Sequence, residues 1–407
     1  MTTDSTTAPV FNPLKPGYME DPYPHFAEMR DGEPVHLSMI DLWVLFDHDD
    51  VFRLLRDPSM SVMDERIEVR DEARLAEMVE AAGGELERDS SMLNTDLPDH
   101  TRLRRLVSKA FTPAAIAALR PRIHELVDET LDRIAADGGG DVVRELAFPL
   151  PFDVISEMLG MPEADKERIA AWSGTLVKSL DPMLAIEAFA EIRAASDAMN
   201  AHIDGVIEWK RANPGDDLLT ALIAAEEDGD SLTPIELRDQ VTLLFVAGHE
   251  TTVNLIGTGI YELLRNPAQA AIWRDDPELD ATAVDEMLRF VGPVQFSRRI
   301  TLADIDFQGV TIPKGMFVLA GLASSNRDPK KWGPTAGDLD VRREGAGQHL
   351  SFGSGSHYCL GASLAKLEAS IAIGSFLRRF PEAAVSGDVQ WNGRINLRGL
   401  EHLPVTV

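Results

Sequence analysis

Residues 352–361 read FGSGSHYCLG, a glycine-rich loop that contains the only cysteine of the chain, Cys359. An apolar stretch with helical periodicity follows, from Ala362 to Phe380, and Pro381 ends it. Cys359 is therefore expected at the N-terminus of a helix. Unpaired N–H groups and the positive end of the helix dipole favour a thiolate there and lower the pKa of the thiol. A sulfur in that position is ready to bind a metal ion.

The glycines of the loop bear on what the cysteine does. Gly353, Gly355 and Gly361 carry no Cβ, so the backbone can approach a flat cofactor and point N–H groups at the sulfur. A lone cysteine is more often a small buried hydrophobe, but the flanking pattern argues against that role. A phosphate-binding loop is a further alternative, although residues 353–355 lack the third glycine and the lysine of such loops. The loop therefore favours a metal ligand.

Composition excludes several classes of protein. One cysteine in 407 residues rules out an internal disulfide and a CxxC zinc or redox site. The 67 acidic and 39 basic residues give a net charge of -28, which repels nucleic acid and anionic lipid surfaces. Residues 1–16 show no secretory signal, and no later stretch resembles a membrane span. We expect a cytoplasmic protein without nucleic-acid or membrane partners.

Helical patterning dominates the chain. Its clearest example is Pro121 to Ala136, which the glycines at 138–140 end. Alternating apolar residues at Leu42 to Phe46 and Asp306 to Ile312 predict short strands. The fold class is therefore mainly α with small β-sheets. Further helices are expected at Pro24 to Arg30, Ala185 to Arg211 and Thr282 to Phe290.

The longest helical signal begins at Thr233-Pro234-Ile235-Glu236, which has the features of a capping box with proline at the first helical position. It should continue to about Arg265. Some thirty residues at 1.5 Å each give a helix of roughly 45 Å, long enough to cross a domain. Nearly every position from Val241 to Leu264 is apolar or small, except the polar residues 249–252 at its centre. This helix is expected to be buried on most sides.

Four segments together resemble a known family. Residues 352–361 are similar to the haem-ligand signature of the cytochrome P450 family, F-G-x-G-x-H-x-C-x-G. Residues 286–289 resemble its E-x-x-R pair, residues 247–251 its oxygen-activation motif, and residues 100–104 its H-x-x-x-R motif. The resemblance extends over nearly the whole chain. It implies the cytochrome P450 fold, with a long central helix over the haem.

The resemblance also implies the domain organisation and the cofactor. Residues 21–407 would form one large domain behind an N-terminal extension of residues 1–20. The cofactor would be haem b, iron protoporphyrin IX, with Cys359 as the thiolate ligand of its iron. Phe352, Gly353 and Gly361 would belong to the loop that binds it.

Two carboxylates on a partly buried haem need cationic donors. The family motifs assign this role to four residues, His100, Arg104, Arg299 and His357. Arg299 is included because it stands five residues before Asp304, as in the R-x-x-x-x-D run of the family. Ordinary surface charge is the alternative for all four.

Glu250 and Thr251 are polar residues within an apolar helix, where a buried carboxylate must be paired, solvated or neutralised. The resemblance implies that they carry protons to dioxygen through ordered water, beside Ala247 and Gly248. Gly248 would leave room for the oxygen. The alternative is a polar patch that faces a neighbouring helix.

Glu286 and Arg289 stand three residues apart on a predicted helix and can pair. By resemblance the pair is structural, with Arg343 as a candidate third member. Residues 332–340, just before Arg343, carry leucine in place of the usual phenylalanine and one extra residue, so the pattern leaves the role of Arg343 open.

The implied reaction is monooxygenation, in which one oxygen atom of O₂ is inserted into a hydrophobic small molecule. The chain has no dinucleotide or flavin fingerprint, so electrons should come from NAD(P)H through a separate ferredoxin reductase and ferredoxin. Arg102, Arg105 and Lys109 form a basic cluster where an acidic ferredoxin could dock, although a solvated helix face is an equal alternative. A peroxide-dependent peroxygenase and a haem-thiolate binding protein without turnover are the competing functions.

The substrate is expected to contact apolar walls. Candidate pocket residues come from the long helix and from the segment after the E-x-x-R helix: Leu244, Ala247, Val294, Gln295 and Phe296. They suit a lipid, terpenoid, steroid or aromatic compound. The enzyme is expected to be a monomer.

Overall fold

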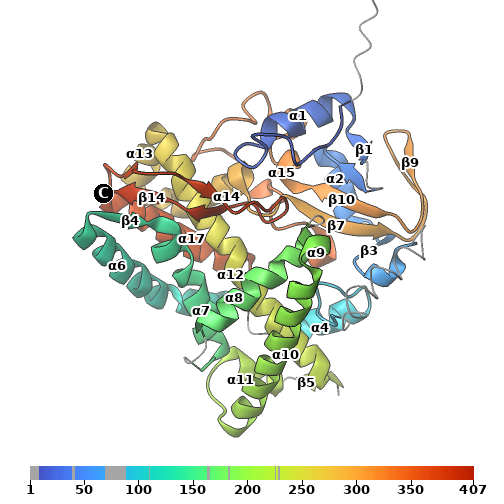
Figure 1. Cartoon of the computed structure of the whole chain (residues 1–407), viewed down its shortest axis with the longest axis horizontal. Coiled ribbons are helices and arrows are strands. Elements are labelled where there is room, and N and C mark those ends of the chain that lie inside the picture. The colour runs from blue at the N-terminus through green and yellow to red at the C-terminus, as the bar shows by residue number, and fades with distance from the viewer. Residues whose placement is uncertain are drawn as a thin grey trace, which may run out of the picture.

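The computed structural model describes residues 9–38, 42–68, 89–109, 111–162, 166–181, 184–224, 226–227 and 230–407 (Figure 1). The described helices are α1 Tyr23–Gly32, α2 His48–Arg56, α4 Asp99–Ser108, α5 Pro113–Ala118, α6 Arg120–Asp137, α7 Pro149–Leu159, α8 Lys166–Leu176, α9 Leu184–Glu187, α10 Phe189–Ala212, α11 Leu218–Ile223, α12 Pro234–Arg265, α13 Pro267–Asp275, α14 Asp280–Val291, α15 Leu322–Ser325, α16 Pro329–Trp332 and α17 Ala362–Arg379. The described strands are β1 Val35–Leu37, β2 Trp43–Leu45, β3 Met60–Ser61, β4 Gly139–Asp141, β5 Glu226–Glu227, β6 Asp230–Ser231, β7 Phe296–Thr301, β8 Ile305–Phe307, β9 Val310–Ile312, β10 Phe317–Gly321, β11 Ala384–Val385, β12 Gln390–Trp391, β13 Leu400–His402 and β14 Pro404–Thr406. The mainly α architecture with small sheets is confirmed.

The long helix α12 runs through the middle of the molecule and contacts α7, α10 and α17 (Figure 1). Its predicted capping box is present: the Thr233 hydroxyl accepts the N–H of Glu236 at 3.2 Å, and the Glu236 carboxylate accepts the N–H of Thr233 at 2.8 Å. The helix ends at Arg265, directly before Asn266-Pro267. Both predicted ends are confirmed.

The other predicted helices are present as α1, α6, α14 and α17, and α6 ends at Gly138 with φ 70°. The stretch from Ala185 to Arg211 is wrong as one helix. It is divided into α9 and α10 at Ala188, whose φ of -101° and ψ of 16° leave the helical range. Alanine has no side-chain signal for such a break.

A five-stranded sheet joins strands from residues 35–61 with strands from residues 296–321, in the order β1-β2-β10-β7-β3. Strands β2 and β10 are parallel, with Trp43 opposite Val318, and the other pairs are antiparallel. The predicted strand from Asp306 to Ile312 is instead a hairpin of β8 and β9. It turns at Gln308 and Gly309, with φ of 53° and 82°.

The core that positions the site lies between α6, α7, α12, α14 and α17, and the fully buried Trp273 and Phe376 belong to it. The N-terminal segment packs on the domain, because Phe11 contacts Phe46 and Phe296 with ring centroids 5.5 and 5.7 Å apart. Residues 1–8 of the expected extension lie outside the described residues, and the boundary between residues 20 and 21 stays a prediction. Within the described ranges, no helix combines the length and apolar character needed to cross a bilayer.

Candidate functional site

Cys359 lies at the start of α17, where Gly361 is the N-cap, as predicted. Its own N–H donates to the carbonyl of Phe352 at 2.9 Å, which closes the loop. The predicted lowering of its pKa is wrong for this structure. Burial raises the pKa of the Cys359 thiol, although the N–H groups of Gly361 and Ala362 and the charge of Arg104 act in the opposite direction. The helix N-terminus is in place, but desolvation outweighs it.

Two of the three loop glycines are required by the backbone. Gly353 and Gly355 have φ of 69° and 76°, in the left-handed region that favours glycine. A Cβ at Gly355 would lie 2.8 Å from the carbonyl oxygen of Leu55, so the loop rests directly on the end of α2. Gly361 has an ordinary φ of -82° and no atom within 4 Å of the Cβ position. Its backbone therefore does not demand glycine.

The four predicted cationic residues are brought together beside Cys359. The rings of His100 in α4 and His357 in the loop have centroids 4.1 Å apart. Burial lowers the pKa of His357 to about 3, and the charges of His100, Arg299 and Arg104 add to the effect. Arg299 is buried, which lowers its pKa to about 10 with help from the charge of Arg298. The cluster is thus a concentration of mutually repelling basic groups.

This cluster fits a group with two carboxylates. Among the described residues, no carboxylate forms a hydrogen bond or ion pair with His100, Arg104, Arg299 or His357 in this structure. Arg299 donates only to the Ser297 hydroxyl at 3.0 Å and the Arg298 carbonyl at 2.6 Å. The Nδ1 atom of His100 is buried without a partner. Buried cations of this kind need anionic partners, and the two propionates of haem would supply them next to a cysteine sulfur.

The centre of α12 presents two kinds of residue. Ala247 is exposed and Thr251, one turn later, is partly exposed, whereas His249 and Glu250 are buried. The Thr251 hydroxyl donates to the Ala247 carbonyl at 2.9 Å. A Cβ at Gly248 would lie 3.6 Å from the side chain of Ile155 in α7, which places that position at a helix contact.

Glu250 has a partner that the sequence did not reveal. Its Oε2 accepts a hydrogen bond from Nη1 of Arg394 at 2.8 Å. Arg394 belongs to the turn between β12 and β13, 144 residues farther along the chain. An isolated arginine in a turn carries no local signal for such a pairing.

The E-x-x-R pair forms inside the protein. Arg289 donates to Glu286 at 2.6 and 2.7 Å, and both side chains are fully buried. Arg343 donates to the same carboxylate at 3.2 Å, so the candidate third member also makes this contact. Arg289 further donates at 2.7–2.8 Å to three carbonyls of the segment before the loop, those of Asn326, Ala336 and Asp338.

The candidate pocket residues do not share one environment. Leu244 is buried in the cluster against which Leu360 of the cysteine loop packs. Val294 is partly buried, and Gln295 is buried and donates to the Gly292 carbonyl at 2.8 Å. The ring of Phe296 belongs to the aromatic cluster of the N-terminal segment, which argues against its place in the pocket wall.

The basic cluster on α4 consists of one partly buried residue and two exposed residues. Arg102 binds Glu236 at the start of α12 and also lies 4.0 Å from Asp99. Arg105 and Lys109 are exposed. Arg102 therefore links α4 to α12, and the exposed part of the cluster is Arg105 with Lys109.

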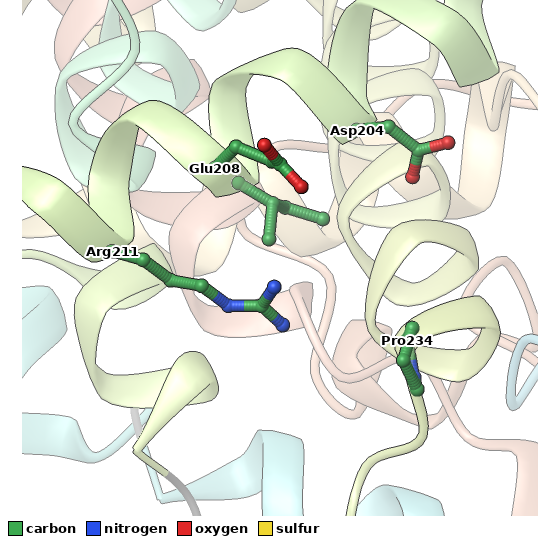
Figure 2. A pocket seen from close by; sticks show the side chains of 5 residues that line it. Asp204, Glu208, Arg211 and Pro234 are labelled. Atoms are coloured by element: carbon green, nitrogen blue, oxygen red, sulfur yellow. The ribbon is translucent and has the colours of Figure 1, made fainter.

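A separate small pocket of about 280 Å³ lies between α10 and the beginning of α12. Figure 2 shows Asp204, Glu208 and Arg211 of α10 facing Pro234 across it. Pro234 is some 25 Å from Thr251 along the helix axis, at 1.5 Å per residue. This pocket is distinct from the site at Cys359.

Comparisons with known proteins agree with the site. A model of the cytochrome P450 family matches residues 65–274 and 277–392. Cytochrome P450 107B1 of Saccharopolyspora erythraea is 43% identical over 95% of each chain, and a vitamin D(3) 25-hydroxylase of Pseudonocardia autotrophica is 39% identical over 96% of this chain and 94% of its own. The structure of the cytochrome P450 PksS, of the bacillaene polyketide synthase of Bacillus subtilis, superposes with a TM-score of 0.87 at 34% identity, covering 98% of this chain and 99% of that one. The chain therefore belongs to the cytochrome P450 family and is a haem-thiolate oxidoreductase.

Proposed function

We propose that this protein is a monooxygenase that hydroxylates or epoxidises a hydrophobic small molecule, with Cys359 as the ligand of the haem iron. The observation that carries the proposal is the cluster of four basic side chains beside Cys359, which has no carboxylate partner among the described residues. His100, Arg104, Arg299 and His357 would hold the haem propionates. Phe352, Gly353 and Gly361 would shape the loop around the thiolate.

Cys359 would hold the haem iron through its thiolate, and haem, when bound, would supply the redox chemistry of dioxygen. Thr251 and Glu250 would move protons at the hydroxyl and the carboxylate on α12. Ala247 would leave space beside them, since it is exposed in the middle of that helix. The place of Gly248 against Ile155 favours a packing role at that position.

Electrons would come from NAD(P)H through a ferredoxin reductase and a ferredoxin, because the chain contains no dinucleotide or flavin fingerprint. The exposed Arg105 and Lys109 would meet an acidic ferredoxin on α4. We further propose that the enzyme acts in the cytoplasm as a monomer.

The substrate would be of steroid or polyketide size. The names of two relatives, a vitamin D(3) 25-hydroxylase and a cytochrome P450 of a polyketide synthase, support this class. Leu244 and Ala247 of α12 would line its site, together with Val294. A screen of steroids, macrolactones, terpenoids and fatty acids for a change in the ferric haem spectrum should identify ligands in the first two groups.

The decisive test is turnover of such a ligand by dioxygen with ferredoxin, reductase and NAD(P)H. Equal product from hydrogen peroxide alone would favour the peroxygenase. Bound ligands that are never converted would favour a binding protein.

A further inference from the structure

We infer that Arg394 is a positioning residue for Glu250, which keeps this carboxylate in place for proton delivery at Thr251. The inference rests on the proposed role of Glu250. It begins from the ion pair between Nη1 of Arg394 and Oε2 of Glu250 at 2.8 Å, with side chains only 17% and 10% exposed. A pair so little exposed to water is held more firmly than a surface ion pair.

Arg394 also reaches α8. Its Nη2 donates to the carbonyl of Gly174 at 3.3 Å. A Cβ at Gly174 would lie 3.5 Å from Oε1 of Glu250, the oxygen that Arg394 does not bind. The carboxylate is therefore enclosed between the guanidinium and the last turns of α8.

The turn that carries Arg394 is itself fixed. The buried Asp181 accepts the N–H of Ile395 at 2.7 Å and that of Asn396 at 3.4 Å. Asn396 accepts the N–H of Gln295 through its backbone carbonyl at 2.9 Å. Arg394 is thus presented by a turn bonded to both the segment after α8 and the start of β7.

The position of the pair matters because Glu250 and Thr251 are not bonded to each other. The Thr251 hydroxyl donates to the Ala247 carbonyl at 2.9 Å, and successive helix positions project about 100° apart. Without Arg394, the buried carboxylate would lose its ion-pair partner and would turn towards water. That movement would take the carboxylate away from the position in which Arg394 holds it beside Thr251.

A matched control is a second arginine–glutamate ion pair, in α12, the helix that carries Glu250. Arg265 donates to Glu262 at 3.2 Å, also within α12, but Arg265 is 56% exposed and lies at the end of the helix. Replacing it removes one arginine and one ion pair from α12 without touching the site.

The first experiment compares the wild-type holoenzyme with R394Q, R394K and R265Q, using vitamin D3 as the probe. With dioxygen, ferredoxin and reductase, R394Q should form product about tenfold more slowly, less than the hundredfold or more expected from loss of a proton-transfer group. The spectral binding constant for vitamin D3 should change less than twofold. R394K should recover at least half of the rate, and R265Q should match the wild type.

Reaction driven by hydrogen peroxide distinguishes positioning from general damage, since peroxide already carries the protons that dioxygen needs. R394Q should keep its peroxide-driven rate. An equal loss with both oxidants, or an unchanged rate with dioxygen, would overturn the inference.

A second measurement does not depend on turnover and so separates failure of this inference from failure of the proposed function. The free energies of unfolding of the wild type, R394Q, E250Q and the double variant form a double-mutant cycle. The unfolding equilibrium constant of the double variant should differ at least fivefold from the value expected if the effects of the two single substitutions were independent. If no variant, including the wild type, turns over vitamin D3, the proposed function fails for this probe, while additivity in the cycle would independently refute the contact.

Discussion

Arg289 donates two hydrogen bonds to Glu286, at 2.6 and 2.7 Å, in a part of the core where neither side chain is exposed. The same guanidinium binds three backbone carbonyls of the segment that precedes the cysteine loop. One side chain therefore satisfies a buried carboxylate and fixes the irregular backbone that leads to Cys359. Its importance is structural, and it can be measured without turnover.

Arg289→Met should destabilise the fold by about 3–5 kcal/mol, because it leaves a buried carboxylate with Arg343 alone and removes the donors of three carbonyls. Urea unfolding of the purified protein measures the change, with Arg265→Met as the surface control. If the two variants were equally stable, the buried pair would not have the role assigned to it.

Cys359→Ser should abolish the thiolate-type spectrum of the reduced carbon monoxide complex, because a serine hydroxyl does not supply a thiolate. Circular dichroism should still report the helical fold, since Cys359 contributes to the loop through its backbone N–H. An unchanged carbon monoxide spectrum would refute the assignment of the iron ligand.

Arg299→Met should have effects of opposite sign on the haem-free and haem-bound proteins. Removal of a buried cation without a carboxylate partner among the described residues should stabilise the haem-free protein by about 1–2 kcal/mol. The same change should weaken haem retention, measured by transfer of haem to an acceptor protein.

Arg298→Met is the control for this prediction. Arg298 is adjacent in the strand, but unlike Arg299 it already has a carboxylate partner, because it donates to Asp64 at 2.5 Å. It should leave haem retention unchanged, and loss of haem from both variants alike would contradict the assignment of Arg299.

Arg105→Glu should slow reduction by an acidic ferredoxin at low ionic strength, by about tenfold, because electrostatic steering acts mainly on the association rate. The difference from the wild type should shrink as salt is added. Stopped-flow reduction in the presence of carbon monoxide measures it. Identical rates at low salt would leave the exposed part of α4 as an ordinary solvated face.

The N-terminal segment should loosen in mild acid. Nε2 of His25 accepts the N–H of Asn12 at 3.0 Å, which requires a neutral ring. Burial lowers the pKa of His25, while Glu28 opposes this shift and Lys15 and His36 add to it. The folded state therefore takes up the proton less readily than the unfolded chain, whose pKa is about 6.5. The stabilisation is complete above that pH and is lost as the pH falls below it.

Hydrogen exchange measures this prediction locally. The protection factor of the Asn12 amide should fall between pH 7.5 and pH 5.5, after correction for the intrinsic exchange rate. His25→Leu should remove the pH dependence together with the hydrogen bond. A protection factor that is constant over this range in the wild type would contradict it.

Elements with local end signals could be predicted from the sequence. The capping box at Thr233 and Glu236, the glycine at 138 and the proline at 381 each mark a helix end through backbone chemistry that acts within a few residues. The break at Ala188 has no such chemistry. The two arms of the hairpin at Gln308 were predicted as a single strand because the apolar alternation continues across its turn.

Within the site, residue types could be predicted but surroundings could not. The structure places His100, His357 and Arg299 near one another, while their role towards haem stays a prediction. The direction in which the pKa of Cys359 shifts depends on burial. The pairing of Glu250 with Arg394 depends on a contact between residues 144 positions apart in the chain. Both arise from tertiary structure, which helical periodicity in the sequence does not predict.

The parallel pairing of β2 with β10 has a consequence during protein synthesis. Trp43 leaves the ribosome about 275 residues before its partner Val318. At about 5–20 residues per second, the early strand must wait roughly 15–55 s for its neighbour. During that interval β2 has β1 as its only strand partner and its other edge stays open, so a nascent chain arrested before residue 317 is the form in which chaperones should meet this protein.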